Sequence, residues 1–174
     1  SSRRGRPIKL TARILAPLAA SNTIGLDIQS WLENGWLDMV IAGLVDHTWL
    51  DLGDIVEIAH AHGRPVYASI KADAGHLPGS SPEVFRAIAA NHYRAGADGI
   101  HLFNMNGLRR SSRKPPLGPQ YDFQPLREIG SLENIRHRSK HYVLDDIGAG
   151  HKVPADVLDG WPRWMQDRLL RSEV

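Results

Sequence analysis

The chain contains no cysteine among its 174 residues. Disulfides, thiolate metal sites and a cysteine nucleophile are therefore excluded, while the cellular compartment stays open. No apolar run approaches the roughly 20 residues of a membrane-spanning helix, and no signal-peptide pattern is visible. The formal net charge is only +2, and the two basic runs, "SSRRGRPIK" and "RRSSRKPP", carry no interleaved aromatic residues. Neither a membrane nor a nucleic acid is therefore expected as a partner.

Motifs for cofactors and metals are also missing. No glycine-rich nucleotide fingerprint follows any predicted strand. His60 and His62 are two residues apart in a predicted helix, so they do not share a face and make a poor metal pair. The sequence therefore predicts neither a cofactor nor a metal site.

What the chain does contain is a repeated order of apolar strand, loop, amphipathic helix and glycine turn. Its length suits one domain with a sizeable core. The predicted strands are residues 9–18, 37–45, 64–72 and 98–105, and the predicted helices are residues 22–35, 51–63, 81–97 and 122–131. Gly35, Gly63 and Gly96 are expected to end the first three helices, and Ser81 with Pro82 to begin the third.

This alternation predicts an α/β fold in which parallel strands are joined by right-handed helical crossovers. Helices that cover such a sheet explain why its strands are nearly continuous apolar runs. Residues 1–130 form the predicted strand–helix domain. The pattern weakens in residues 131–174, a predicted C-terminal extension with a candidate strand at 140–146 and a candidate helix at 161–170.

Side chains alternate across a strand, and this assigns a face to each residue. In the third strand Val66, Ala68 and Ile70 form the set expected to meet the helices. The opposite set carries polar groups on several strands: Arg13, Tyr67, Ser69, Lys71, His101 and Phe103. One face of the sheet is therefore predicted to be a polar lining, although a hydrogen-bonded core histidine is an equal alternative for His101.

More polar residues follow the strands. In parallel α/β folds the ligand site lies at the carboxyl ends of the strands. The residues there are Asp46, His47, Lys71, Asp73, Asn104 and Asn106. Amides, carboxylates and aromatic rings suit a polar, neutral ligand such as a sugar. For Asp46 and Asp73 the alternative is a purely structural role in capping a loop or turn.

Three stretches carry a family resemblance: "GLDIQSWLENGWLDMVIAG", "VEIAHAHGRPVYASI" and, most specifically, "YRAGADGIHLFN". Over roughly residues 8–146 the chain resembles the C-terminal half of a (β/α)₈ barrel from bacterial glycoside-hydrolase-like proteins. The resemblance implies a partial TIM-type barrel whose four strands are strands five to eight, with the helices outside. A full barrel needs about 250 residues, so strands one to four would lie outside this chain.

The resemblance implies a function in binding or hydrolysing a glycan. Asp46 and Asp73 are the candidate catalytic residues, and the candidate substrate-binding residues are Arg13, His47, Tyr67, Lys71, His101, Asn104 and Asn106. Glycoside hydrolysis uses two carboxyl groups about 5–10 Å apart. The chain departs from the family here, because its strand seven ends without a glutamate and the sequence identifies no such pair.

Two other functions stay open. "GADGIHL" also resembles the last strand of phosphate- or flavin-binding barrels, and "NMNGLRRSS" supplies one glycine with arginines where such barrels bind phosphate. A non-catalytic binding or interaction module is the third hypothesis. Half a barrel has two open sheet edges, so the expected partners are a second copy of the chain or a preceding half-barrel.

Overall fold

The computed structural model of the chain describes residues 5, 7–43, 50–71, 81–103 and 124–142, with residues 71, 124 and 125 described by their backbone alone. Its strands are β1 (Thr11–Ile14), β2 (Met39–Ala42), β3 (Val66–Lys71) and β4 (Gly99–Phe103). Its helices are α1 (Leu18–Thr23), α2 (Ile28–Glu33), α3 (Gly53–Ala61), α4 (Pro82–Arg94), α5 (Gln124–Glu128) and α6 (Leu132–Ile135).

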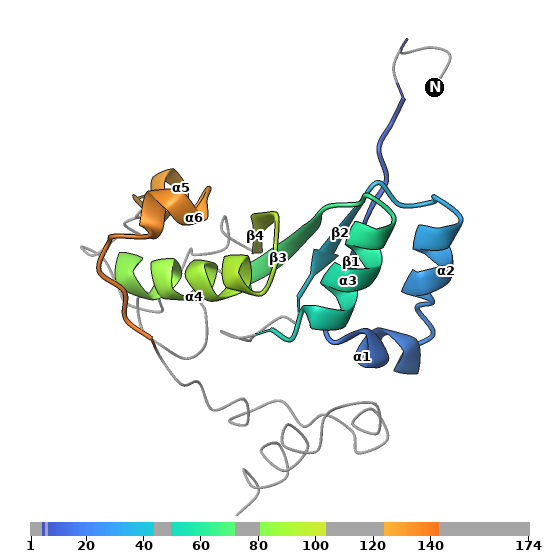
Figure 1. The fold of residues 1–174 in the computed structure, drawn as a ribbon, viewed down its shortest axis with the longest axis horizontal. Coiled ribbons are helices and arrows are strands. Elements are labelled where there is room, and N and C mark those ends of the chain that lie inside the picture. The colour runs from blue at the N-terminus through green and yellow to red at the C-terminus, as the bar shows by residue number, and fades with distance from the viewer. Residues whose placement is uncertain (1–4, 6, 44–49, 72–80, 104–123, 143–174) are drawn as a thin grey trace, which may run out of the picture.

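The strands form one parallel sheet in the order β1-β2-β3-β4. Register pairs Arg13 with Ile41, Ile41 with Tyr67, and Tyr67 with Gly99. Figure 1 shows α1, α2 and α3 grouped beside the first strands, and α4 running past β3 and β4. The predicted α/β fold with a sequentially ordered parallel sheet is confirmed.

The core lies between the sheet and its helices. Val66, Ala68 and Ile70 of β3 are fully buried. Two of them pack in one cluster with helix residues such as Ile28 and Ile55, and Ile70 packs in a second cluster with residues of α4. The alternation argument therefore assigned the helix-facing side of β3 correctly.

One predicted helix was wrong in its extent. The segment predicted as a single helix over 22–35 lies in two helices, α1 and α2, and α1 begins earlier, at Leu18. Gly25, whose φ of +83° lies in the left-handed region, interrupts the helical backbone between them. Asp27 then starts α2, because its carboxylate accepts a hydrogen bond from the Ser30 N–H at 3.0 Å.

The limits of the other predicted helices agree better with the structure, except that the helix predicted over 122–131 ends, as α5, at Glu128. Gly35, Gly63 and Gly96 follow α2, α3 and α4 with φ values of +66°, +64° and +97°. Left-handed backbone of this kind favours glycine, so the predicted stops are confirmed. α4 begins at Pro82 after Ser81, as predicted.

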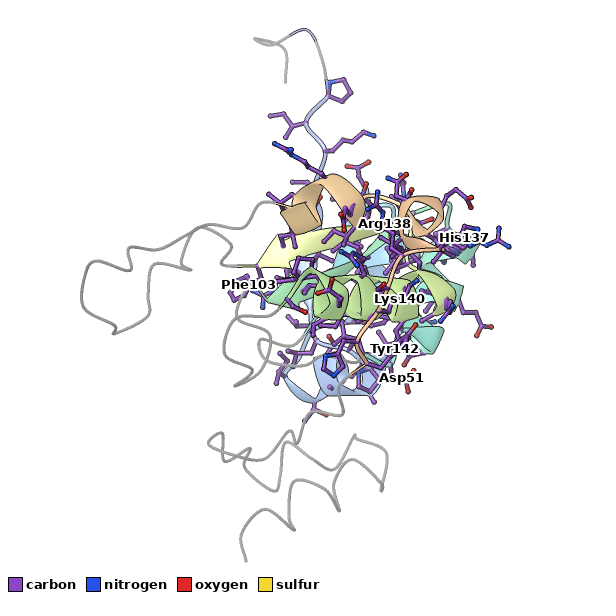
Figure 2. All side chains as sticks on the ribbon, turned by 90° about the vertical axis from the view of Figure 1, so that its left-hand side faces the viewer. Asp51, Phe103, His137, Arg138, Lys140 and Tyr142 are labelled. Carbon is purple, nitrogen blue, oxygen red and sulfur yellow. The ribbon has the colours of Figure 1, made fainter. Side chains whose placement is uncertain are left out.

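α5, α6 and residues 137–142 pack against α4 through an apolar cluster and a buried ion pair. Arg86 Nε donates to a Glu128 carboxylate oxygen at 2.6 Å, and both side chains are only 7% exposed. Arg86 also donates to the Ser139 carbonyl at 2.7 Å. Figure 2 shows Arg138, Lys140 and Tyr142 following one another across α4. The predicted boundary at residue 130 stays a prediction.

Two further findings bear on the sequence predictions. In the part of the chain that the structure describes, no helix is long and apolar enough to cross a membrane. The candidate helix at 161–170 and most of the candidate strand at 140–146 lie outside the described residues, and residues 140–142 are not in a strand.

Candidate functional site

The face of the sheet opposite the helices is concave. The guanidinium carbon of Arg13 in β1 lies 3.8 Å from the centroid of the Phe103 ring in β4. These strands are three positions apart, about 14 Å in a flat sheet. Their side chains meet because the sheet curls toward this side. Figure 2 shows Phe103 well apart from His137 and Arg138 of the helical side. We call Arg13, Tyr67, Ser69, His101 and Phe103 the concave face.

A serine and a histidine are hydrogen-bonded near the centre of the concave face. The Ser69 hydroxyl and His101 Nδ1 are 3.2 Å apart, and either atom donates, depending on the tautomer of the ring. Ser69 is only 2% exposed. Partial burial, and then the nearby charge of Arg13, lower the pKa of His101 below its ordinary value. The imidazole is therefore neutral at pH 7, with Nε2 as the ring atom that can face a ligand.

Two glycines of the sheet region lie where a larger residue would collide with Ser69 or Tyr67. A Cβ atom at Gly43 in the segment after β2 would lie 2.3 Å from the Ser69 Cβ. A Cβ atom at Gly99 in β4 would lie 2.7 Å from the Tyr67 ring, which leans over that glycine. Contacts this short do not occur, so a Cβ at Gly43 would push the Ser69 backbone away and a Cβ at Gly99 would displace the Tyr67 ring.

The charge on the concave face is positive. The facing residues of β1, β2, β3 and β4 whose side chains are described include Arg13 but no carboxylate. Arg13 forms no ion pair with any described residue, and its partner is the ring of Phe103. The described part of this face can therefore accept an anion or hydrogen-bond a neutral ligand, but it has no group for general acid–base catalysis by carboxylates.

The predicted site residues fall into three groups. The structure brings Arg13, Tyr67 and His101 together on the concave face. Lys71 ends β3, and its side chain is not among those described. The other predicted site residues lie outside the described residues: Asp46, His47, Asp73, Asn104 and Asn106. Their roles stay predictions.

Ser69 and Phe103 were not predicted to bind ligand, although alternation placed both on this face. The strand pattern did contain a signal for Ser69. Gly43 directly follows β2, and a glycine in or next to a strand often marks a close approach by another group. For Phe103 no local signal exists, because its contact with Arg13 depends on how far the sheet curls.

Asp54 and Asp98, two carboxylates elsewhere in the described residues, have structural roles. Asp54 accepts the Leu18 N–H at 2.9 Å, and its partial burial raises the pKa of the carboxyl. Asp98 accepts the Val66 N–H at 2.8 Å and pairs with His60 Nε2 at 2.8 Å. Burial raises the pKa of Asp98, but these hydrogen bonds outweigh it and the net shift is downward. Both residues lie at junctions between elements.

No group of three or more histidine, aspartate or glutamate side chains that could hold a metal ion occurs among the described residues.

Comparison with models of known protein families finds none that matches the chain, and comparison with curated proteins finds no significant match. The resemblance to glycoside-hydrolase-like barrels therefore stays a prediction.

Proposed function

We propose that this chain is the strand-five-to-eight segment of a glycoside-hydrolase-like (β/α)₈ barrel, and that its concave face binds carbohydrate. The observation that carries the proposal is the contact between Arg13 and Phe103. It joins the first and last strands of the sheet across the side opposite the helices, which is compatible with the inward-curled wall of a partial barrel.

The chemistry of the concave face supports a sugar ligand. Sugar hydroxyls both donate and accept hydrogen bonds, and the face offers groups of both kinds. His101 is neutral at pH 7 because its pKa is lowered by burial and by Arg13. The Phe103 ring and the half-buried Tyr67 ring add apolar surface for the carbon face of a sugar.

Hydrolysis is the second part of the proposal. The described concave face supplies no carboxylate, so Asp46 and Asp73 remain the candidate catalytic residues. Each follows a strand at its carboxyl end, where barrel enzymes hold their catalytic groups. Asp46→Asn and Asp73→Asn are each expected to abolish glycosidase activity, with glycoside binding retained.

Binding is tested by titrating the full chain with a 4-nitrophenyl glycoside and, separately, with flavin mononucleotide. Millimolar or tighter glycoside affinity with no flavin binding is the expected result. Tight flavin binding without glycoside binding would refute the proposal in favour of a flavin-binding barrel. A chain that binds neither would favour the interaction module.

The sheet edges support a proposal about partners. Among the described residues β1 and β4 each pair with one strand only. Ile8 and Leu10, just before β1, are 62% and 58% exposed, and Trp36 is 58% exposed. Figure 1 shows the segment before β1 extending beyond the helices. We propose that a second copy of the chain covers this edge when no preceding half-barrel is present.

Sedimentation velocity at micromolar concentration tests that proposal. A dimer is expected, and Leu10→Ser should weaken it. A monomer for the unsubstituted chain would contradict the proposal.

A further inference from the structure

One cation on the concave face has no carboxylate partner among the described residues. Arg13 extends from β1, and the carbon of its guanidinium lies 3.8 Å above the centroid of the Phe103 ring. A guanidinium that stacks on a ring by its flat face keeps its in-plane N–H groups free. Those groups have the fork geometry that matches a planar carboxylate.

The neighbouring groups set the charge that a ligand must balance. His101 lies close enough to Arg13 for its pKa to be lowered by that charge, after the larger effect of burial. Its Nδ1 is engaged by Ser69 at 3.2 Å. The described side chains of the concave face thus present one positive charge at pH 7, next to a neutral imidazole with a free Nε2.

We infer that the concave face binds a sugar that carries a carboxylate, with Arg13 as the anion partner and His101 as the neutral hydrogen-bonding partner. This inference rests on the proposed carbohydrate function and adds its substrate class, a uronic acid. A carboxylate has a single negative charge, which one guanidinium balances. A phosphate monoester carries about −1.5 to −2 charges at pH 7, which is more than the guanidinium of Arg13 balances by itself.

The test compares two ligands that differ only at one carbon. 4-Nitrophenyl glucuronide has a carboxylate where 4-nitrophenyl glucoside has a hydroxymethyl group. Both are titrated into the full chain, with inorganic phosphate as a third ligand, and affinities are measured by calorimetry. The glucuronide is expected to bind about tenfold or more tightly than the glucoside, as a charge-assisted hydrogen-bonded pair provides.

Single substitutions test which side chain causes the tighter binding of the glucuronide. Arg13→Gln should make the two glycosides bind equally, and Phe103→Leu should reduce the preference because the guanidinium loses its ring support. Arg127→Gln is the matched control, since Arg127 is exposed on α5, away from the sheet's concave side. Circular dichroism and the thermal midpoint verify that each variant is folded. A preference that survives in Arg13→Gln would overturn the assignment.

The remaining outcomes separate this inference from the proposed function. Equal affinity for glucoside and glucuronide in the unsubstituted chain would overturn the inference and leave the carbohydrate function standing. Phosphate that binds more tightly than glucuronide would also overturn it. A chain that binds neither glycoside would overturn both.

Discussion

The guanidinium carbon of Arg13 lies 3.8 Å from the centroid of the Phe103 ring, although the two residues belong to the first and last strands of the sheet. The contact links two strands that share no backbone hydrogen bond. It therefore reports the curl of the whole sheet rather than a local pairing. Both the concave face and the proposed ligand site depend on it.

The first prediction concerns this pair. Cation–π pairs at exposed sites contribute about 0.5–1 kcal/mol. Arg13→Gln, Phe103→Leu and the double variant form a thermodynamic cycle, and urea unfolding measures the free energy of unfolding of each. We expect a coupling energy of about 0.5–1 kcal/mol. Effects that add within about 0.3 kcal/mol would show that the two side chains do not interact.

The second prediction concerns Gly43. Gly43→Ala places a methyl group 2.3 Å from the Ser69 Cβ, and both atoms are attached directly to backbone, so β2 and β3 must move apart. We expect the free energy of unfolding to fall by about 1–3 kcal/mol, as overpacked cores do. Gly53→Ala is the matched control. Its nearest neighbour would be an Asp51 carboxylate oxygen at 3.7 Å, so equal losses in the two variants would contradict the steric argument.

The third prediction concerns the buried ion pair between α4 and α5. Glu128→Gln removes the 2.6 Å partner of Arg86 and leaves this buried charge with the partly exposed Glu83 at 3.4 Å. The expected loss of stability is up to about 3–5 kcal/mol. Replacing both residues, as Arg86→Met with Glu128→Leu, should cost less than the single change, because no buried charge is left without its partner. Arg138, which also pairs with Glu128 at 3.1 Å, is half exposed. Glu133→Gln is the control, since its pair with Arg136 is exposed and 3.8 Å long, worth about 0–1 kcal/mol. A double variant less stable than Glu128→Gln would contradict the argument.

The fourth prediction concerns pH. Burial lowers the pKa of His92 in α4 from 6.5 to about 4. Between these pH values the unfolded chain binds a proton that the folded chain does not, so stability falls as pH falls from 6.5 to 4. The shift corresponds to about 3 kcal/mol.

His92→Leu should remove this contribution. The Nε2 atom of His92 is buried without a hydrogen-bond partner among the described residues, so its removal should cost little at pH 7. Urea unfolding at pH 7 and pH 4.5 is expected to show a smaller loss of stability for this variant than for the unsubstituted chain. His137→Leu, an exposed control, should behave like the unsubstituted chain. An unchanged pH dependence in His92→Leu would refute the assignment.

The sequence was sufficient to predict the sheet and its helix-facing side. Apolar alternation in β3 identified Val66, Ala68 and Ile70 as buried, and they are fully buried. Glycine stops identified the ends of three helices because left-handed backbone leaves few other choices. The split between α1 and α2 was missed. It depends on Gly25 and on the Asp27 cap, two local signals that lie inside an otherwise amphipathic pattern.

The candidate site was predicted only in part. Alternation put Arg13, Tyr67 and His101 on one face, because period-two geometry needs no tertiary information. It did not predict that Arg13 reaches Phe103 or that Ser69 holds His101, because both contacts depend on the curl and register of strands far apart in sequence. The buried ion pair of Arg86 and Glu128 was not predicted for the same reason, since the two residues are 42 positions apart in the sequence.

The proposed function requires that a glycoside binds the concave face rather than the helical side. Nuclear magnetic resonance of the uniformly ¹⁵N- and ¹³C-labelled full chain, titrated with 4-nitrophenyl glucoside, gives the decisive test. The signals of Arg13, Tyr67, His101 and Phe103 are expected to shift with one common affinity, while those of Ile55 and Ile88 on the helical side stay unchanged. Shifts confined to helical residues, or no shifts at millimolar glycoside, would contradict the proposed function.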